Sequence, residues 1–275
     1  MYKISKSVSQ RISSGIKNYQ SIIQSAIARD INEKDTVTIV IDILSDLFGY
    51  NKYSEITGEY QIRSTYCDLA TMVNGKVNLL IEVKSVGIEL KPIHTKQAVD
   101  YAANQGIDWV ILTNAVKWEV YKVNFTKPID QELVYSFNFL ELSTKLSKDI
   151  ELLFPLTKEG TVKSSLNLYH DQRQALSRYT ITATILSEDF LNILKRTLRK
   201  MSPGINIDNN EISEVLTNEI IKREVLENDQ LKESIKKVNK LNSKANRPNK
   251  TSEIRNTSEQ KGNISQLLIT GKFNE

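Results

Sequence analysis

The sequence lacks features that several classes of protein require. It has one cysteine, Cys67, so no disulfide can form within the chain, and a cytoplasmic setting is the natural expectation. No apolar run approaches the roughly 20 residues of a membrane-spanning helix. The P-loop pattern G-x-x-x-x-G-K-[ST] does not occur, which excludes a P-loop nucleotide motor from these 275 residues. The two histidines, His94 and His170, are isolated, and neither is predicted to bind a metal.

Acidic residues are absent from the first 29 positions, which contain lysine, arginine and many serines. This composition fits a transit peptide or a basic amphipathic helix that opens the domain. The apolar spacing runs on through residues 22–31 without a cleavage-like site and favours the helix. The net charge of +4 is compatible with a polyanionic partner but does not require one.

Apolar periodicity along the first 156 residues indicates alternating helices and strands. Residues 33–48 carry a helical stripe, with Asn32 as N-cap and Gly49 as the stop. Further helices are expected at 93–105 and 141–153. Strand patterns occur at 54–62, 65–73, 77–86, 108–114, 117–123 and 133–139. This order predicts an α/β domain over residues 1–156, with a mixed sheet flanked by helices.

Beyond residue 160 the strand pattern disappears. Helical patterns at 170–186, 187–200 and 209–240 predict an α-helical accessory region over residues 165–240. Residues 242–275 are rich in Asn, Ser, Lys and Thr and are expected to form a disordered tail.

An acid and a base lie two positions apart on a segment that is otherwise apolar. Glu82 and Lys84 point to one face, because side chains alternate along a strand. Asp68, fourteen positions before Glu82, lies on the preceding strand-like segment. Unpaired charges are unfavourable in buried strands, so two carboxylates and a lysine at a sheet edge indicate a site for a divalent metal and an attacked phosphodiester. The alternative is a partly exposed salt-bridge network.

The hairpin between these strands decides whether Asp68 shares a face with Glu82. A two-residue loop at Asn74-Gly75 would leave the two carboxylates on opposite faces. A three-residue loop ending in Gly75 would place Asp68 opposite Leu80 and diagonal to Glu82, on the same face. The metal site therefore requires the three-residue loop, or another bulge that restores the same parity.

Five groups of short motifs follow one another over roughly residues 30–125. They are Asn32-Glu33-Lys34-Asp35-Thr36 with Phe48-Gly49-Tyr50, Tyr66-Cys67-Asp68, Ile81-Glu82-Val83-Lys84, Gln97 with Tyr101, and Leu112-Thr113-Asn114 with Trp118-Glu119-Val120-Tyr121. In this order they resemble the PD-(D/E)xK nuclease superfamily, and within it the N-terminal nuclease domain of type I restriction R subunits and their stand-alone relatives. Cys67 stands where the superfamily has proline, and Ala115 stands where relatives usually have glycine.

The resemblance implies a restriction-endonuclease-like fold and an endonuclease that hydrolyses phosphodiester bonds in DNA, in restriction or defence. It implies Mg²⁺ as cofactor, with Mn²⁺ as a substitute. Asp68 and Glu82 would be the metal ligands, joined by the backbone carbonyl of Val83 and by Glu33 from the first helix. Oxygen ligands of this kind are those that Mg²⁺ prefers.

The resemblance also assigns roles outside the metal ligands. Lys84 and Gln97 would be catalytic, with Lys84 orienting the attacking water. Tyr101, one helical turn after Gln97, would contact the DNA backbone. Separately, a basic cluster at the end of a predicted helix is a candidate for phosphate binding, although compensation of the helix dipole explains it as well: Lys195, Arg196, Arg199 and Lys200.

Two alternatives to an active nuclease remain open. The first is a non-catalytic module of the same fold that binds nucleic acid or assembles with a partner. The second is a purely structural interaction protein. The sequence also leaves open whether the chain acts alone, as a homo-oligomer, or beside a separately encoded motor or specificity protein.

Overall fold

The computed structural model describes residues 3–62, 65–125 and 127–245. The chain divides into two compact units, Met1–Ser177 and Arg178–Glu275. The tail expected to be disordered lies outside the described residues from residue 246 on, while residues 242–245 belong to the end of a helix. No helix in the described part of the chain is both long and apolar enough to pass through a lipid bilayer.

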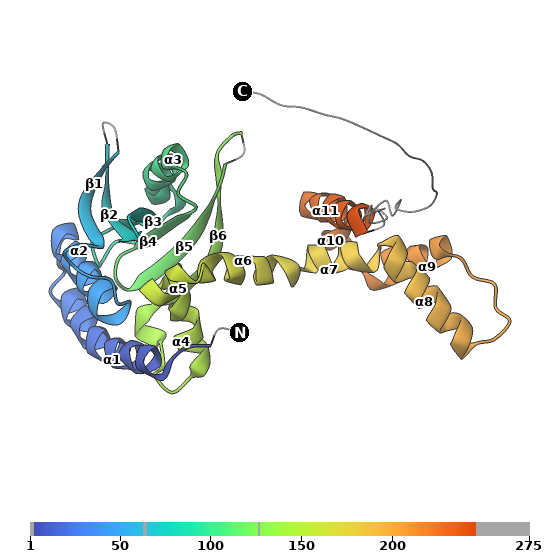
Figure 1. Ribbon diagram of the computed structural model, residues 1–275, viewed down its shortest axis with the longest axis horizontal. Coiled ribbons are helices and arrows are strands. Elements are labelled where there is room, and N and C mark those ends of the chain that lie inside the picture. Colours follow the sequence, from blue (N-terminus) through green and yellow to red (C-terminus); the bar gives the residue numbers. More distant parts are fainter. Residues whose placement is uncertain (1–2, 63–64, 126, 246–275) are drawn as a thin grey trace, which may run out of the picture. The chain divides into compact units, whose positions relative to one another are not determined.

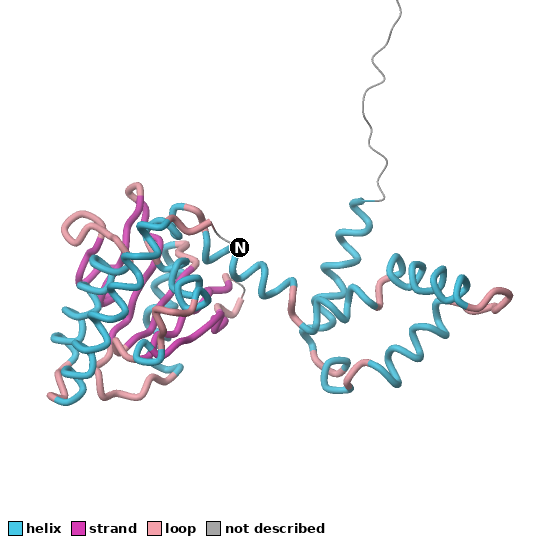
Figure 2. Tube along the Cα trace, turned by 90° about the horizontal axis from the view of Figure 1, so that it is seen from below, coloured by secondary structure: helices cyan, strands magenta, loops and turns pink. Residues whose placement is uncertain are grey.

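The strands form one mixed sheet in the first unit (Figures 1 and 2). Six strands follow their sequence order across the sheet, and only β3 and β4 pair in parallel. They are β1 (Ile56–Ile62), β2 (Thr65–Val73), β3 (Lys76–Val83), β4 (Trp109–Thr113), β5 (Lys117–Asn124) and β6 (Asp130–Asn138). This arrangement confirms the predicted α/β class with a mixed sheet flanked by helices.

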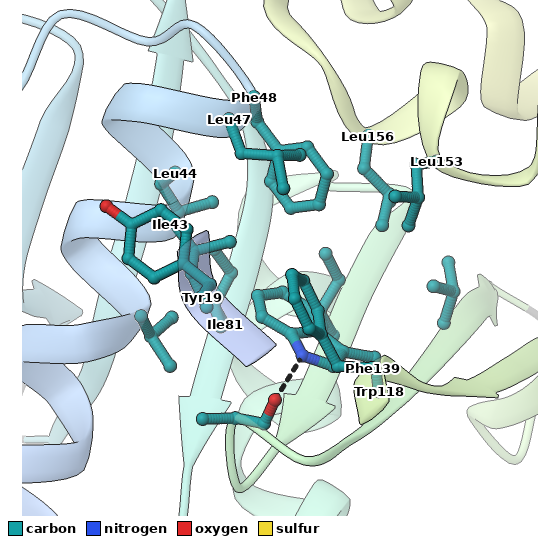
Figure 3. Packing of buried hydrophobic residues seen from close by; sticks show 14 of the residues in the cluster. Tyr19, Ile43, Leu44, Leu47, Phe48, Ile81, Trp118, Phe139, Leu153 and Leu156 are labelled. Atoms are coloured by element: carbon teal, nitrogen blue, oxygen red, sulfur yellow. Dashed lines mark hydrogen bonds between the residues drawn. The ribbon is translucent and has the colours of Figure 1, made fainter. Parts of the chain in front are cut away.

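One face of the sheet is covered by the two N-terminal helices, α1 (Lys6–Ala28) and α2 (Glu33–Asp42) (Figure 1). The helix expected over residues 33–48 is in fact α2 followed by a π-helical turn, η1 (Ile43–Leu47). Gly49 follows at a φ of 84°, which confirms it as the stop. Figure 3 shows Phe48 beside the Trp118 indole, and their ring centroids are 5.8 Å apart in an edge-to-face arrangement.

The other face is covered by α3 (Lys96–Gln105), which connects the parallel strands β3 and β4. Parallel neighbours require such a crossover, because a tight turn cannot join them. A 3-10 turn, η2 (Pro92–Thr95), precedes the helix, so the helix begins later than the expected residue 93. Gly106 ends it in the left-handed conformation at a φ of 67°. Leu80, Val110 and Leu112 lie in the apolar cluster beneath it.

Five short helical segments complete the first unit: η3 (Phe139–Glu141), α4 (Ser147–Leu153), η4 (Phe154–Leu156), α5 (Lys158–Val162) and α6 (Ser165–Ala175). The helix expected at 141–153 therefore forms only in its second half. Long-range contacts hold α6 on the sheet, since the Trp109 indole donates to Asn167 at 3.2 Å and His170 Nε2 lies 3.1 Å from Glu132 Oε2.

The second unit is entirely helical in its described part (Figure 2). It contains α7 (Arg178–Ile185), α8 (Glu188–Met201), α9 (Asn209–Val215), a π-helical turn η5 (Leu216–Ile220), α10 (Arg223–Leu226) and α11 (Asp229–Ala245). This confirms the predicted helical C-terminal region. The expected helix at 170–186 is split into α6 and α7, and the one at 209–240 is interrupted where Ile221 is extended, with a ψ of 130°.

The β2–β3 hairpin closes with a two-residue turn and not with the three-residue loop considered above. Val73 pairs with Lys76 across a two-residue turn, in which Asn74 and Gly75 have φ values of 54° and 74°. Asn-Gly favours this turn, because its twist matches that of the strands. The three-residue loop, one of the two arrangements that would place Asp68 and Glu82 on one face, does not form, because the turn residues satisfy the tighter geometry.

A bulge further along the hairpin places Asp68 and Glu82 on the same face, which the two-residue turn alone would not do. Met72 pairs with Val77, whereas Thr71 pairs with Leu79, so Asn78 is an extra residue on β3. Past the bulge, every β3 side chain is on the face opposite to the one that a regular hairpin would give it. The bulge thus meets the requirement on which the predicted metal site depends.

Candidate active site

Glu82 and Lys84 lie where β3 ends at the centre of the sheet. Glu82 is the penultimate residue of β3 and is only 7% exposed. It faces Leu112 of the neighbouring strand β4, whose side chain packs in the cluster beneath α3. Lys84 follows the strand, and its backbone N–H donates to the Thr113 carbonyl at 2.8 Å, which extends the pairing by one residue. Both side chains are therefore held by the sheet itself.

Asp68 joins them from β2. Leu69 pairs with Ile81, so the register places Asp68 opposite Glu82 instead of opposite Leu80, which pairs with Ala70. Asp68 Oδ2 accepts a hydrogen bond of 2.7 Å from the backbone N–H of Val83. A three-residue loop would have placed Asp68 opposite Leu80, whereas the two-residue turn with its bulge places it two residues further along β3, and the two carboxylates are directly opposed.

The Lys84 ammonium group lies among carboxylates. Its Nζ is 2.7 Å from Glu82 Oε1 and 3.6 Å from Glu33 Oε2. Glu33 stands in the first turn of α2, where Asn32 caps the helix by accepting a 2.9 Å hydrogen bond from the Asp35 N–H. The predicted cap is confirmed. The side chain of Glu33 is 48% exposed, so it borders the site from the solvent side.

Burial and mutual repulsion shape the charges of the site. Burial is the largest influence on the pKa of Glu82 and raises it, and the charge of Asp68 raises it further. Burial also raises the pKa of Asp68, against the Val83 N–H and the charge of Lys84. For Lys84, burial alone would lower the pKa, but the hydrogen bond and charge of Glu82, with Asp68 and Glu33, outweigh it and raise it. Lys84 is therefore an ammonium ion at neutral pH.

The donor set fits a magnesium ion. Asp68 and Glu82 each have one oxygen in a hydrogen bond, and their other oxygens, Oδ1 and Oε2, accept none from the described residues. Those residues contain no group of three His, Cys, Asp or Glu side chains placed to hold a metal. Mg²⁺ is usually bound through one or two carboxylates, with water and substrate phosphate completing its shell. Two opposed carboxylates that repel each other are therefore sufficient.

Gln97 and Tyr101 lie on α3, over the same face of the sheet. The Gln97 amide donates to the Tyr101 hydroxyl, so the two residues interact as their spacing of one helical turn predicts. Tyr101 is only 5% exposed and packs in the cluster beneath α3. Gln97 is exposed and lines a hollow of about 360 Å³ with Tyr101 and Lys96. The surface that this pair offers to a ligand thus comes mainly from Gln97.

The basic cluster lies elsewhere in the chain. Lys195, Arg196, Arg199 and Lys200 are on α8, which belongs to the second unit. Together with Asn192 they line a hollow of about 430 Å³.

Asn114 was not singled out from the sequence for any role, yet it connects the site to the β4–β5 turn. Its amide Nδ2 donates to the Ile88 carbonyl at 2.8 Å and to the Val86 carbonyl at 3.4 Å, in the segment that follows Lys84. Its Oδ1 accepts from the N–H of Lys117 at 2.8 Å. In the sequence, an asparagine between two strand patterns is a turn signal that could have drawn attention to it.

Comparison with known proteins gives one match. Residues 37–134 match the family model described as type I restriction enzyme R protein N terminus. No curated protein and no solved structure matches the chain. The matched segment contains Asp68, Glu82, Lys84, Gln97, Tyr101 and Asn114, whereas Glu33 and the basic cluster of α8 lie outside it. Residues 37–134 are therefore similar to the N-terminal domain of type I restriction enzyme R proteins.

Proposed function

We propose that the chain is a metal-dependent endonuclease that hydrolyses phosphodiester bonds in DNA as part of a restriction or defence system. The observation that carries the proposal is the arrangement of Asp68, Glu82 and Lys84 on one face at the end of β3. The family of residues 37–134 supports it, because its description names a restriction enzyme subunit.

In this proposal Asp68 and Glu82 hold the metal through the oxygens that no described residue engages, Oδ1 and Oε2. The Val83 carbonyl and Glu33 are the further oxygen donors proposed for it. A bound Mg²⁺ would lower the pKa of a water molecule that it binds and would stabilise negative charge on the phosphoryl oxygens. A cation would also offset the repulsion that raises the pKa of Glu82.

Lys84 is the proposed catalytic cation. Its side chain is an ammonium ion, and its backbone is held to the sheet by the hydrogen bond to Thr113. It would orient the attacking water and donate a hydrogen bond to the phosphoryl oxygen on which charge develops. Glu82 would keep it in place through the 2.7 Å ion pair. Gln97, exposed on α3, is proposed to steady the site beside it.

DNA is the proposed substrate, and Tyr101 would contribute its hydroxyl beside Gln97. A motor or a specificity protein is the further partner proposed for it, and no P-loop motif occurs in these residues.

A cleavage panel tests this proposal. Wild-type protein is incubated with duplex DNA, single-stranded DNA and RNA, each with Mg²⁺, Mn²⁺ or EDTA. The proposal predicts cutting of DNA with either metal and none with EDTA. If no nucleic acid is cut under any condition, the enzyme interpretation fails, and binding without cutting would favour the non-catalytic module of the same fold.

A further inference from the structure

The second unit contains a helix whose two sides differ sharply. On one side of α8, Leu191 is buried and packs with Ile212 and Leu216, and Leu194 lies against the same cluster. The cations Lys195, Arg196, Arg199 and Lys200 lie on the other side. At about 100° per residue they fall within about 140° of the helix circumference. The face formed by these four residues and Asn192 is called the α8 basic face.

The positive charge of this face is not neutralised within the unit. The ion pairs of the described second unit join Arg178 to Glu224, Arg223 to Glu227 and Lys232 to Asp229. None of them includes a cation of the α8 basic face. The acids of α8 itself, Glu188 and Asp189, are in its first turn at the far end of the helix. Four like charges are thus concentrated on α8 without an ion-pair partner among the described residues.

Compensation of the helix dipole accounts for only part of this charge. The dipole acts over the last turn, which contains Arg199 and Lys200. Lys195 and Arg196 lie before that turn and gain little from it. Moreover, Lys195 faces Arg199 and Arg196 faces Lys200 at i,i+4, and each such like-charge pair costs about 0.2–0.5 kcal/mol. The helix dipole therefore does not account for Lys195 and Arg196.

The shape and chemistry of the face fit phosphate groups. The four cations and Asn192 line a hollow of about 430 Å³. Asn192 is held by a 2.9 Å hydrogen bond from Asn209, and the Arg199 guanidinium is held by donation to the Ile207 carbonyl at 2.9 Å. No aromatic side chain stands among the cations on which a base could stack, so the face offers charge without a means of reading bases.

We propose that the α8 basic face binds the phosphate backbone of nucleic acid without regard to sequence. The inference rests on the proposed function for its choice of partner, and it adds that affinity for DNA resides partly in the second unit. An anionic lipid surface is less suited, because Leu191 and Leu194 on the apolar side of α8 pack against Ile212 and Leu216. Of the described apolar residues on that side, only Leu198 and Met201 are exposed.

Binding of a fluorescent duplex by the full-length chain in EDTA tests this inference. The test variant is Lys195→Gln/Arg196→Gln/Lys200→Gln, which leaves Arg199 and its contact with Ile207 intact. The control variant, Lys236→Gln/Lys237→Gln/Lys240→Gln, removes the same charge from exposed positions of α11 in the same unit. Circular dichroism and thermal unfolding check that both variants fold.

The test variant should bind at least about tenfold more weakly than wild type near 0.1 M salt, and the slope of log affinity against log salt should fall by about two to three. The control variant should lose less than about threefold. Equal losses in the two variants, or no loss in the test variant, would overturn the inference, as would tighter binding of anionic vesicles than of duplex. Because EDTA prevents metal-dependent cutting, failure here leaves the proposed nuclease activity untouched, and absence of cutting does not affect this result.

Discussion

Lys84 and Glu82, two positions apart at the end of one strand, form a 2.7 Å ion pair directly opposite the position of Asp68. The pair is largely removed from water, since the side chain of Lys84 is 20% exposed and that of Glu82 is 10% exposed. Breaking a buried pair by removing one partner is strongly unfavourable. The position of the ammonium group is thus set by the same carboxylate that is proposed to hold the metal.

Removal of both carboxylates should abolish metal binding. Asp68→Ala/Glu82→Ala eliminates the two oxygen donors that no described residue engages, and we expect the affinity for Mn²⁺ to fall at least about tenfold. Calorimetric titration of Mn²⁺ measures the change, and Glu132→Ala, whose carboxylate bonds to His170, serves as the control. Unchanged Mn²⁺ binding in the double variant would eliminate the proposed metal site.

Asn114 should matter for stability because it ties the segment after Lys84 to the β4–β5 turn. Asn114→Ala removes the hydrogen bonds to the Ile88 carbonyl and from the Lys117 N–H, and each such bond contributes about 0.5–1.5 kcal/mol. We expect a clear loss of the free energy of unfolding in urea. Asn104→Ala, at an exposed position of α3, should have little effect. A variant of Asn114 as stable as wild type would show that the turn does not depend on these bonds.

Ala115 has a backbone conformation that favours glycine. It is fully buried and has a φ of 68°, a conformation that costs an L-residue roughly 1–2 kcal/mol. Ala115→Gly removes this strain but adds about 0.5–1 kcal/mol of chain entropy and loses a buried methyl group, so its net effect should be within about 1 kcal/mol. Ala115→Val combines a branched side chain at positive φ with overpacking and should lose at least about 2 kcal/mol. The free energies of unfolding of both variants in urea test these expectations, and a valine variant as stable as wild type would contradict them.

Arg11 and Glu159 should give the fold a pH dependence in the acid range. Two hydrogen bonds of 2.9 and 2.6 Å join the guanidinium to the carboxylate, and Arg11 also donates to the Leu47 carbonyl. Burial alone would raise the pKa of Glu159, but the bonds and charge of Arg11 outweigh it, and the pKa lies below its ordinary value of 4.5. A lowered folded pKa means that this stabilisation is present above pH 4.5 and is lost as the pH falls through the folded value.

Glu159→Gln should therefore be less stable than wild type at neutral pH, and the difference should shrink as the pH falls below 4.5. Free energies of unfolding measured in urea from pH 7 to pH 3 test this. A difference that stays constant over that range would show that the ionised carboxylate is not the source of the stability.

Local pattern was enough to predict the sheet and the common face of Glu82 and Lys84, because alternation along a strand needs no knowledge of distant residues. It could not locate the bulge. The Asn-Gly turn has its own favoured geometry, and the extra residue is Asn78, the third residue of β3. The sequence therefore indicated that a bulge would place Asp68 and Glu82 on one face, but it did not indicate that the bulge lies at Asn78.

Contacts between distant segments account for the other differences. α6 stays with the sheet because Asn167 and His170 bond to Trp109 and Glu132, which no local pattern reveals. The role of Asn114 likewise depends on Ile88, far from it in sequence. The placement of Glu33 beside Lys84 is a tertiary contact as well, for which the sequence offered only a first-turn acid.

Plasmid cleavage with Mg²⁺ by wild type, Lys84→Ala and Lys76→Ala tests the central claim most directly. Lys76 is an exposed lysine at the other end of the same strand, so its variant removes an equal charge without touching the site. The account predicts equal rates for wild type and Lys76→Ala, and a rate at least about 100-fold lower for Lys84→Ala. Cleavage by Lys84→Ala at the wild-type rate would contradict it.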